Sequence, residues 1–143
     1  MDNLGFLTFA QNTKDIDYLR LAYLQAMNVK LLHPKAEYAV IVDKFTHKSL
    51  TDKMKKIFNY IIELPIDLAE KDEKKFANEI NVAKYTPFKE TIKLESDLLF
   101  TRSINHWFHS FRTKSILFSF NCKNYKNELT NNMYYRSFFV KNY

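Results

Sequence analysis

The stretch that decides the fold is LGFLTFAQNTKDIDYLRLAYLQAMNVKLLHPKAEYAVIVD, residues 4–43. It opens with the mostly apolar run Leu4–Ala10 and closes with a second apolar run, Tyr38–Val42. Short apolar runs of this kind are typical of buried parallel strands. Between them, from Asp15 to about Leu32, apolar residues recur every three or four positions, which is typical of a helix. The stretch therefore predicts a strand, a helix and a second strand.

The predicted helix has recognisable signals at both ends. Thr13 or Asp15 is expected to cap its start, and Pro34 marks its end. The apolar positions that repeat at helical spacing are Ile16, Leu19, Tyr23, Ala26 and Met27.

The alternation of strands and helices continues along the chain. A short helix with Met54, Ile57 and Phe58 on one face is predicted to precede the strand Tyr60–Leu64. The charged segment Leu68–Tyr85 is predicted to be helical and to end before Pro87. Its expected buried side carries Phe76, Ile80 and Ala83.

This order of elements favours an α/β fold, a mostly parallel sheet with flanking helices, because each helix returns the chain to the same edge of the sheet. Further along, Ser103–Phe111 is predicted to be a helix and Ser115–Phe120 a strand. Segment 121–143 has no assignable pattern. With 143 residues, the whole chain is expected to form one domain, 1–143.

Composition excludes several classes of protein. The single glycine, Gly5, cannot build the glycine-rich phosphate loops of P-loop or dinucleotide-binding proteins. The single cysteine, Cys122, excludes an internal disulfide and a zinc site of several thiolates, and it favours a cytoplasmic setting. No apolar run approaches the ~18 residues of a spanning helix, so membrane insertion is not expected. The net charge of +6 gives a weak attraction for polyanions.

The segment TPFKETIKLESD, residues 86–97, reads as a strand that runs into two acidic residues, Glu95 and Asp97. Alternate residues of an extended chain share a face, so both carboxylates can reach one hard cation beyond the strand end. Two plainer readings remain open. Glu95 can pair with Lys93 on the same face, and Asp97 can cap the following turn.

The same segment resembles the nucleotide-diphospho-sugar transferases, the A-type glycosyltransferases, whose sheet presents Pro-Phe-x-x-Thr-x-x-Leu-Asp-x-Asp. Here Glu95 replaces the first aspartate. The resemblance runs from about Leu4 to about Phe120 and implies a short or truncated member with a Rossmann-like half-domain. It implies that Glu95 and Asp97 hold Mn²⁺ or Mg²⁺, which bridges the two phosphates of a nucleotide-diphosphate sugar donor. The acceptor is unknown.

The resemblance also implies a base- and ribose-binding segment. In this chain it corresponds to Ala10, Gln11 and Asn12, with Tyr18 in the following helix. Gln11 and Asn12 can instead form a capped turn, and Tyr18 can pack in the core. Asp43, which closes the second strand, is either a nucleoside contact or a helix cap.

Two other functions stay open from the sequence. One is a catalytically inactive interaction or scaffold protein that retains the fold, because a fold alone does not determine a function. The other is a basic protein associated with nucleic acid, for which the aromatic and basic residues of 121–143 are a weak signal.

Overall fold

The structure is a computed structural model that describes residues 4–69 and 72–105. Contacts divide the chain between Ser103 and Ile104, and the fold described below is that of the first unit, Met1–Ser103. The expectation of a single domain over 1–143 stays a prediction.

Two predicted elements and the unassigned segment lie wholly or largely beyond this part of the chain. The strand Ser115–Phe120 and segment 121–143 lie outside the described residues, and the helix Ser103–Phe111 lies largely outside them.

Four strands form one sheet in the order β3-β2-β1-β4, and every neighbouring pair is parallel. The α/β class and the mostly parallel sheet with flanking helices are therefore confirmed. The strands are β1 (Leu4–Phe9), β2 (Glu37–Val42), β3 (Tyr60–Glu63) and β4 (Glu90–Leu94).

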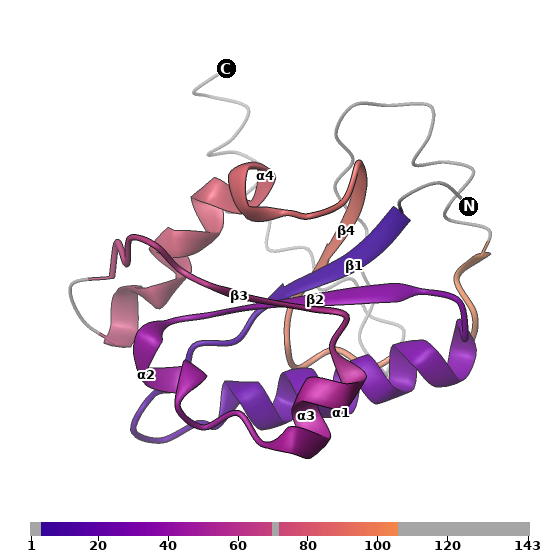
Figure 1. Ribbon diagram of the computed structural model, residues 1–143, viewed down its shortest axis with the longest axis horizontal. Coiled ribbons are helices and arrows are strands. Elements are labelled where there is room, and N and C mark those ends of the chain that lie inside the picture. Colours follow the sequence, from indigo (N-terminus) through magenta and orange to yellow (C-terminus); the bar gives the residue numbers. More distant parts are fainter. Residues whose placement is uncertain (1–3, 70–71, 106–143) are drawn as a thin grey trace, which may run out of the picture. The chain divides into compact units, whose positions relative to one another are not determined.

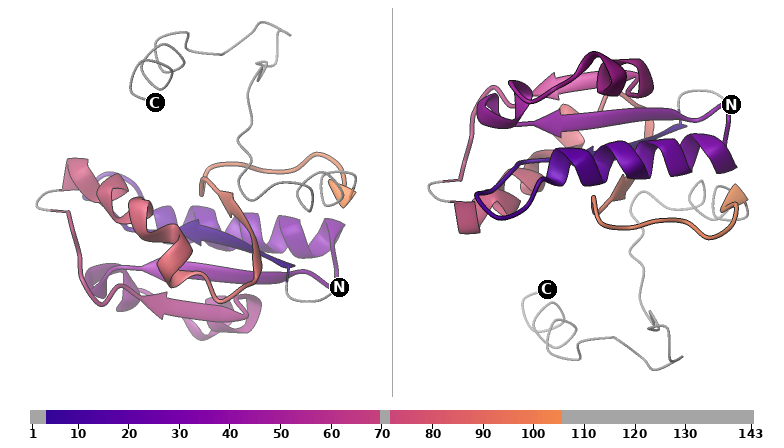
Figure 2. Two further views of the ribbon diagram at one scale, coloured as in Figure 1. Left: turned by 90° about the horizontal axis from the view of Figure 1, so that it is seen from above. Right: turned by 90° about the horizontal axis from the view of Figure 1, so that it is seen from below.

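Helices connect the strands and cover both faces of the sheet. Figure 1 shows α1 and α3 on one side of the strands and α4 on the other, and the two views of Figure 2 agree with this. Helix α1 joins β1 to β2, α2 and α3 join β2 to β3, and η1 and α4 join β3 to β4. Their bounds are α1 Tyr18–Leu32, α2 Lys44–His47, α3 Asp52–Ile57, η1 Asp72–Asn81 and α4 Val82–Tyr85.

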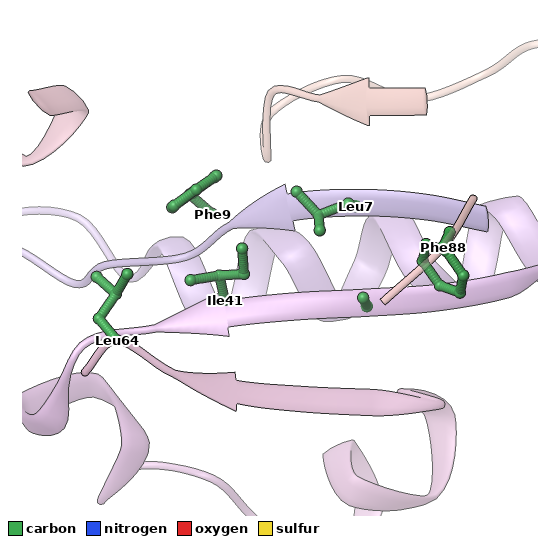
Figure 3. Packing of buried hydrophobic residues seen from close by; sticks show 6 residues of the cluster. Leu7, Phe9, Ile41, Leu64 and Phe88 are labelled. Atoms are coloured by element: carbon green, nitrogen blue, oxygen red, sulfur yellow. The ribbon is translucent and has the colours of Figure 1, made fainter. Parts of the chain in front are cut away.

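One face of the sheet carries an apolar cluster beneath α4. Figure 3 shows Leu7 and Phe9 of β1 beside Ile41 of β2, with Leu64 and Phe88 at the two ends of the cluster. Val82 and Tyr85 of the α4 segment pack against these residues. A strand that is covered on both faces has a nearly continuous apolar sequence, which is why β1 and β2 are recognisable from the sequence.

The opposite face packs against α1. The centroids of the Tyr38 and Phe58 rings lie 6.0 Å apart. The Tyr38 hydroxyl donates a hydrogen bond to the side-chain oxygen of Gln25 of α1. The fully or nearly fully buried residues of α1 are Leu19, Ala22, Gln25, Ala26 and Val29. Gln25 is the polar member of this buried stripe.

The start of α1 differs from the prediction. The helix begins at Tyr18, and its cap is Asp17, whose carboxylate accepts from the Arg20 amide. The hydroxyl of Thr13 instead accepts from the amides of Asp15 and Ile16 in a turn that precedes the helix. The sequence offered several side chains able to cap, and only the turn geometry decides among them.

The segment before β4 also differs from the prediction. A 3₁₀ helix, η1, runs from Asp72 to Asn81, and only Val82–Tyr85 is α-helical. Ile80 is 83% exposed, and Ala83 is exposed too, so neither lies on a buried side. A 3₁₀ helix has three residues per turn, so it rotates side chains out of the phase expected for an α-helix. Asn78 is buried in their place.

Among the described residues, none of the helices combines the length and the apolar character that crossing a bilayer requires.

Candidate functional site

Three neighbouring strands end at one edge of the sheet. β1 pairs with β2 on one side and with β4 on the other, with Phe9 opposite Ile41 and Thr8 opposite Leu94. The chain moves from β1 outward to β2 and β3, then crosses to the far side of β1 to form β4. The strand order therefore reverses at β1, and in open parallel sheets ligands bind beyond the carboxyl ends of the strands at such a reversal.

The acidic pair follows the end of β4 at this edge. β4 ends at Leu94, so both acids lie beyond the strand, and the amide of Leu98 donates to the carbonyl of Glu95 at 3.2 Å to close a turn. Glu95 and Asp97 are exposed, whereas Ser96 between them is buried. Each carboxylate is therefore exposed, and Asp97 lies in a turn and not in an extended strand.

Lys93 occupies a position between two carboxylates. Its ammonium lies 2.5 Å from Glu79 of η1 and also contacts Glu95. Burial opposes the charge of Lys93, but the hydrogen bonds to Glu79 and Glu95 outweigh it and hold the pKa of Lys93 above its ordinary value. The plain reading of Glu95, an ion pair with Lys93, is therefore present in the structure.

Two amide side chains of α1 hold the segment that carries the acids. Gln25 donates to the carbonyls of Glu95 and Leu98, at 2.5 and 2.7 Å, and its own oxygen accepts from the Tyr38 hydroxyl. Asn28 donates to the carbonyl of Phe100 and accepts from its amide. The turn is thus fixed by partly buried hydrogen bonds to a helix, and its carboxylates are left at the surface.

Gln11 and Asn12, which follow β1, take part in internal hydrogen bonds. Gln11 is buried; it donates to the Lys75 carbonyl and accepts from the side chain of Asn78. The side-chain oxygen of Asn12 accepts from the backbone amide of Leu19 near the start of α1, and the backbone amide of Asn12 donates to the Thr46 hydroxyl. The capped-turn reading describes the contact of Asn12 with the start of α1, whereas Gln11 binds residues of η1 instead.

Asp43, which follows β2, is both a helix cap and one half of a buried ion pair. It accepts from the Thr46 amide at the start of α2, and Lys75 lies 2.7 Å from its second oxygen. Burial raises the pKa of this carboxyl, but hydrogen bonds from Lys75 and Thr46 outweigh it, so the pKa of Asp43 lies below its ordinary range. Lys75 also donates to the carbonyl of Asn12, which ties η1 to the ends of β1 and β2.

The remaining residues of the predicted base and ribose segment are placed as follows. Ala10 is fully buried, and its amide donates to the Ile41 carbonyl. Tyr18 is the first residue of α1 and is half-buried. Of the predicted site residues, Ala10, Gln11, Asn12 and Asp43 therefore follow the carboxyl ends of β1 and β2, Glu95 and Asp97 follow that of β4, and Tyr18 begins α1.

The donor atoms of the acidic pair suit a hard divalent cation. Carboxylate oxygens are the ligands that Mg²⁺ and Mn²⁺ prefer, and a site with two protein ligands leaves positions for phosphate oxygens and water. Within residues 4–69 and 72–105 no group of three His, Cys, Asp or Glu side chains converges as a metal site. A cation at this edge would therefore be held by Glu95 and Asp97 together with phosphate oxygens or water.

Sequence reasoning missed Gln25 and Lys75. The signal for Gln25 was an amide inside an otherwise apolar helical stripe, which indicates a buried polar group that needs partners. Lys75 gave no signal, because it lies within a run of charged residues that reads as a solvated helix face.

No protein-family model matches this chain, and no curated protein sequence matches it.

Proposed function

We propose that this protein binds a nucleotide-diphosphate sugar through a divalent cation at the carboxyl ends of β1 and β4, and that it transfers the sugar to an acceptor hydroxyl. The observation that carries the proposal is the position of β4 in the sheet. β4 lies beside β1 on the side away from β2, so the turn with Glu95 and Asp97 leaves the sheet where the strand order reverses. Ligands of open parallel sheets bind at this point.

The proposal gives the two ends of the site different tasks. Glu95 and Asp97 hold Mn²⁺ or Mg²⁺ and thereby the diphosphate. Ala10, Gln11, Asn12, Tyr18 and Asp43 shape the end that receives the base and ribose. Gln11, Asn12 and Asp43 act by fixing the backbone there, because their side chains are occupied by internal hydrogen bonds.

In the proposed reaction, the acceptor hydroxyl attacks the anomeric carbon of the sugar. The bond between that carbon and the phosphate oxygen breaks, and the nucleoside diphosphate leaves with the bonding electron pair. A bound divalent cation would neutralise the charge that develops on the leaving diphosphate. The single cysteine supports a reducing, cytoplasmic setting for this chemistry.

The test is calorimetric titration of the full chain with uridine and guanosine diphosphate sugars, with and without Mn²⁺. We expect binding that requires Mn²⁺ and that Asp97→Ala abolishes. Asp15→Ala is the matched control, because Asp15 is an exposed acid in the turn that precedes α1. Equal binding by wild type and Asp97→Ala would reject the assignment of the site.

A second candidate is a folded interaction protein without catalysis. It is favoured by the internal ion pair of Glu95 and by the internal hydrogen bonds of the other site residues. In that case the titration shows no dependence on Mn²⁺ with any sugar nucleotide. A nucleic-acid-associated protein, the third reading, would instead bind polyanions with an affinity that falls steeply with salt.

A further inference from the structure

Lys93 places a positive charge close to the position at which the proposed function requires a metal ion. Its ammonium contacts both Glu79 and Glu95, so the oxygens of these two carboxylates lie within two ion-pair distances of each other. Glu79 comes from η1, whereas Lys93 and Glu95 belong to β4 and the turn that follows it. One lysine therefore links the connecting segment to the acidic turn.

The three side chains differ in their freedom to move. Lys93 and Glu79 are 26% and 29% exposed, whereas Glu95 is 60% exposed. The Glu95 carbonyl is held by Gln25, so the backbone is fixed while the carboxylate remains at the surface. Glu95 is thus the partner that can leave the ion pair, and Glu79 is the partner that can retain it.

We propose that Lys93 is an internal counter-ion that holds Glu95 in the metal-free protein, and that it keeps only its ion pair with Glu79 when Glu95 takes up a divalent cation. This inference rests on the proposed function, because it concerns the same cation. Lys93 and Glu79 are positioning residues here, since neither contacts the cation itself.

Electrostatics gives the direction of the effect. An ammonium bound to Glu95 competes with any cation for the same oxygens and repels a divalent ion at close range. Glu79 offsets this competition, because it offers the ammonium a second carboxylate that is only partly exposed. Removing Lys93 should therefore tighten cation binding, and removing the charge of Glu79 should weaken it.

A purely structural ion pair predicts something else. If Lys93 only ties β4 to η1, its loss destabilises the fold and leaves cation affinity unchanged or weaker. A simple field effect of each charge predicts that the two substitutions act independently. Under our proposal Glu79 acts through Lys93, so the effect of changing Glu79 depends on the presence of Lys93.

The experiment measures Mn²⁺ affinity of the full chain from the free-ion signal in electron paramagnetic resonance. We expect Lys93→Met to raise the affinity about fivefold and Glu79→Gln to lower it about threefold, the size of effect for a partly exposed ion pair. Lys93→Arg keeps the charge and should match wild type. Lys89→Met is the control for net charge, because Lys89 is an exposed lysine before β4, and it should leave the affinity unchanged.

The double variant decides the mechanism. In the Lys93→Met background the route through Lys93 is gone and only the direct field of Glu79 on the cation remains, so Glu79→Gln should lower Mn²⁺ affinity by clearly less than the threefold expected in the wild-type background. An unchanged or weaker affinity for Lys93→Met, or a full threefold effect of Glu79→Gln in its background, overturns the inference. Both outcomes differ from failure of the proposed function, in which Asp97→Ala binds Mn²⁺ as well as wild type. If neither wild type nor Lys93→Met binds Mn²⁺, both proposals are overturned.

Discussion

Gln25 connects the helix after β1 with the turn after β4. Its amide group uses both hydrogens on the carbonyls of Glu95 and Leu98, and its oxygen accepts from Tyr38. The side chain is fully buried, so each of these hydrogen bonds replaces contact with water. A buried polar group with all its partners in place specifies one position of the turn.

Replacing Gln25 by leucine, which has nearly the same volume, removes the hydrogen bond that each of these three partners makes with Gln25. We expect Gln25→Leu to lower the free energy of unfolding by about 3 kcal/mol, measured by urea denaturation. Hydrogen exchange should also show faster exchange of the Leu98 amide, because the turn is released. Leu24→Ala, at an exposed position of the same helix, is the control and should cost less. Equal stability of Gln25→Leu and wild type would contradict this account.

Asp43 and Lys75 give the protein an acid-sensitive contact. Because the pKa of Asp43 is lower in the folded chain, acidification protonates the unfolded chain first. The contribution of this carboxylate to stability is therefore complete well above the ordinary carboxylate pKa of about 4, and it is lost as the pH falls through the folded pKa.

Asp43→Asn tests this pH dependence. Asparagine can still accept from the Thr46 amide, so the cap of α2 is kept while the charge is removed. We expect a loss of about 3 kcal/mol at neutral pH, because the mostly buried ammonium of Lys75 loses its ion pair with Asp43. The loss should shrink as the pH approaches 3 in denaturation experiments on both proteins. A loss that does not change with pH would assign the effect to packing.

At the scale of elements, Gly5 sets how closely the segment before β4 approaches β1. A Cβ atom at Gly5 would clash with the ring of Phe88, which is buried in the cluster of Figure 3. The backbone there has no positive φ, so the glycine is required for space and not for conformation.

Gly5→Ala is therefore expected to destabilise the protein by about 2 kcal/mol, although alanine in an unstrained strand would stabilise it. Phe88→Leu shortens the side chain that causes the clash. The cost of the double variant in urea denaturation should be smaller than the sum of the two single costs, which is the sign of direct contact. Additive costs would show that the clash is relieved in another way.

The strands were predictable from the sequence and much of the connecting structure was not. β1 and β2 are apolar throughout because both faces are covered, so their pattern needs no knowledge of their neighbours. The segment before β4 depends on Asn78, which binds Gln11 and Asp67 from distant parts of the chain. Such contacts place a 3₁₀ helix where local spacing favoured an α-helix, and no local pattern contains them.

The candidate site was predictable in its location but not in its contacts. Residues that follow successive parallel strands must meet at one edge, so the grouping of Asn12, Asp43 and Glu95 follows from the fold class alone. Two partners, Lys75 beside Asp43 and Glu79 beside Lys93, depend on how η1 folds back over the sheet. The sequence did place Lys93 two positions before Glu95, where pairing on one strand face is expected.

At the scale of the whole molecule, cation binding at one edge of the sheet should stabilise the entire unit. The acidic turn is held by α1, and the end of β1 is held by η1 through Lys75 and Gln11. Unfolding of any of these elements would dismantle the site. A ligand that binds only the folded chain raises the free energy of unfolding by about 2.7 kcal/mol at a hundred times its dissociation constant.

We therefore expect Mn²⁺ with a nucleotide-diphosphate sugar to raise the melting temperature of the full chain by roughly 10 °C at such a concentration. Asp97→Ala should melt at the wild-type temperature without ligand, because Asp97 is exposed, and it should show no shift with ligand. Lys93→Met should reach half of its maximal shift at a lower Mn²⁺ concentration than wild type. The melting temperatures are measured by differential scanning fluorimetry. If Asp97→Ala shows a ligand-induced shift as large as that of wild type, the ligand binds at another surface, and the acidic turn does not couple ligand binding to stability.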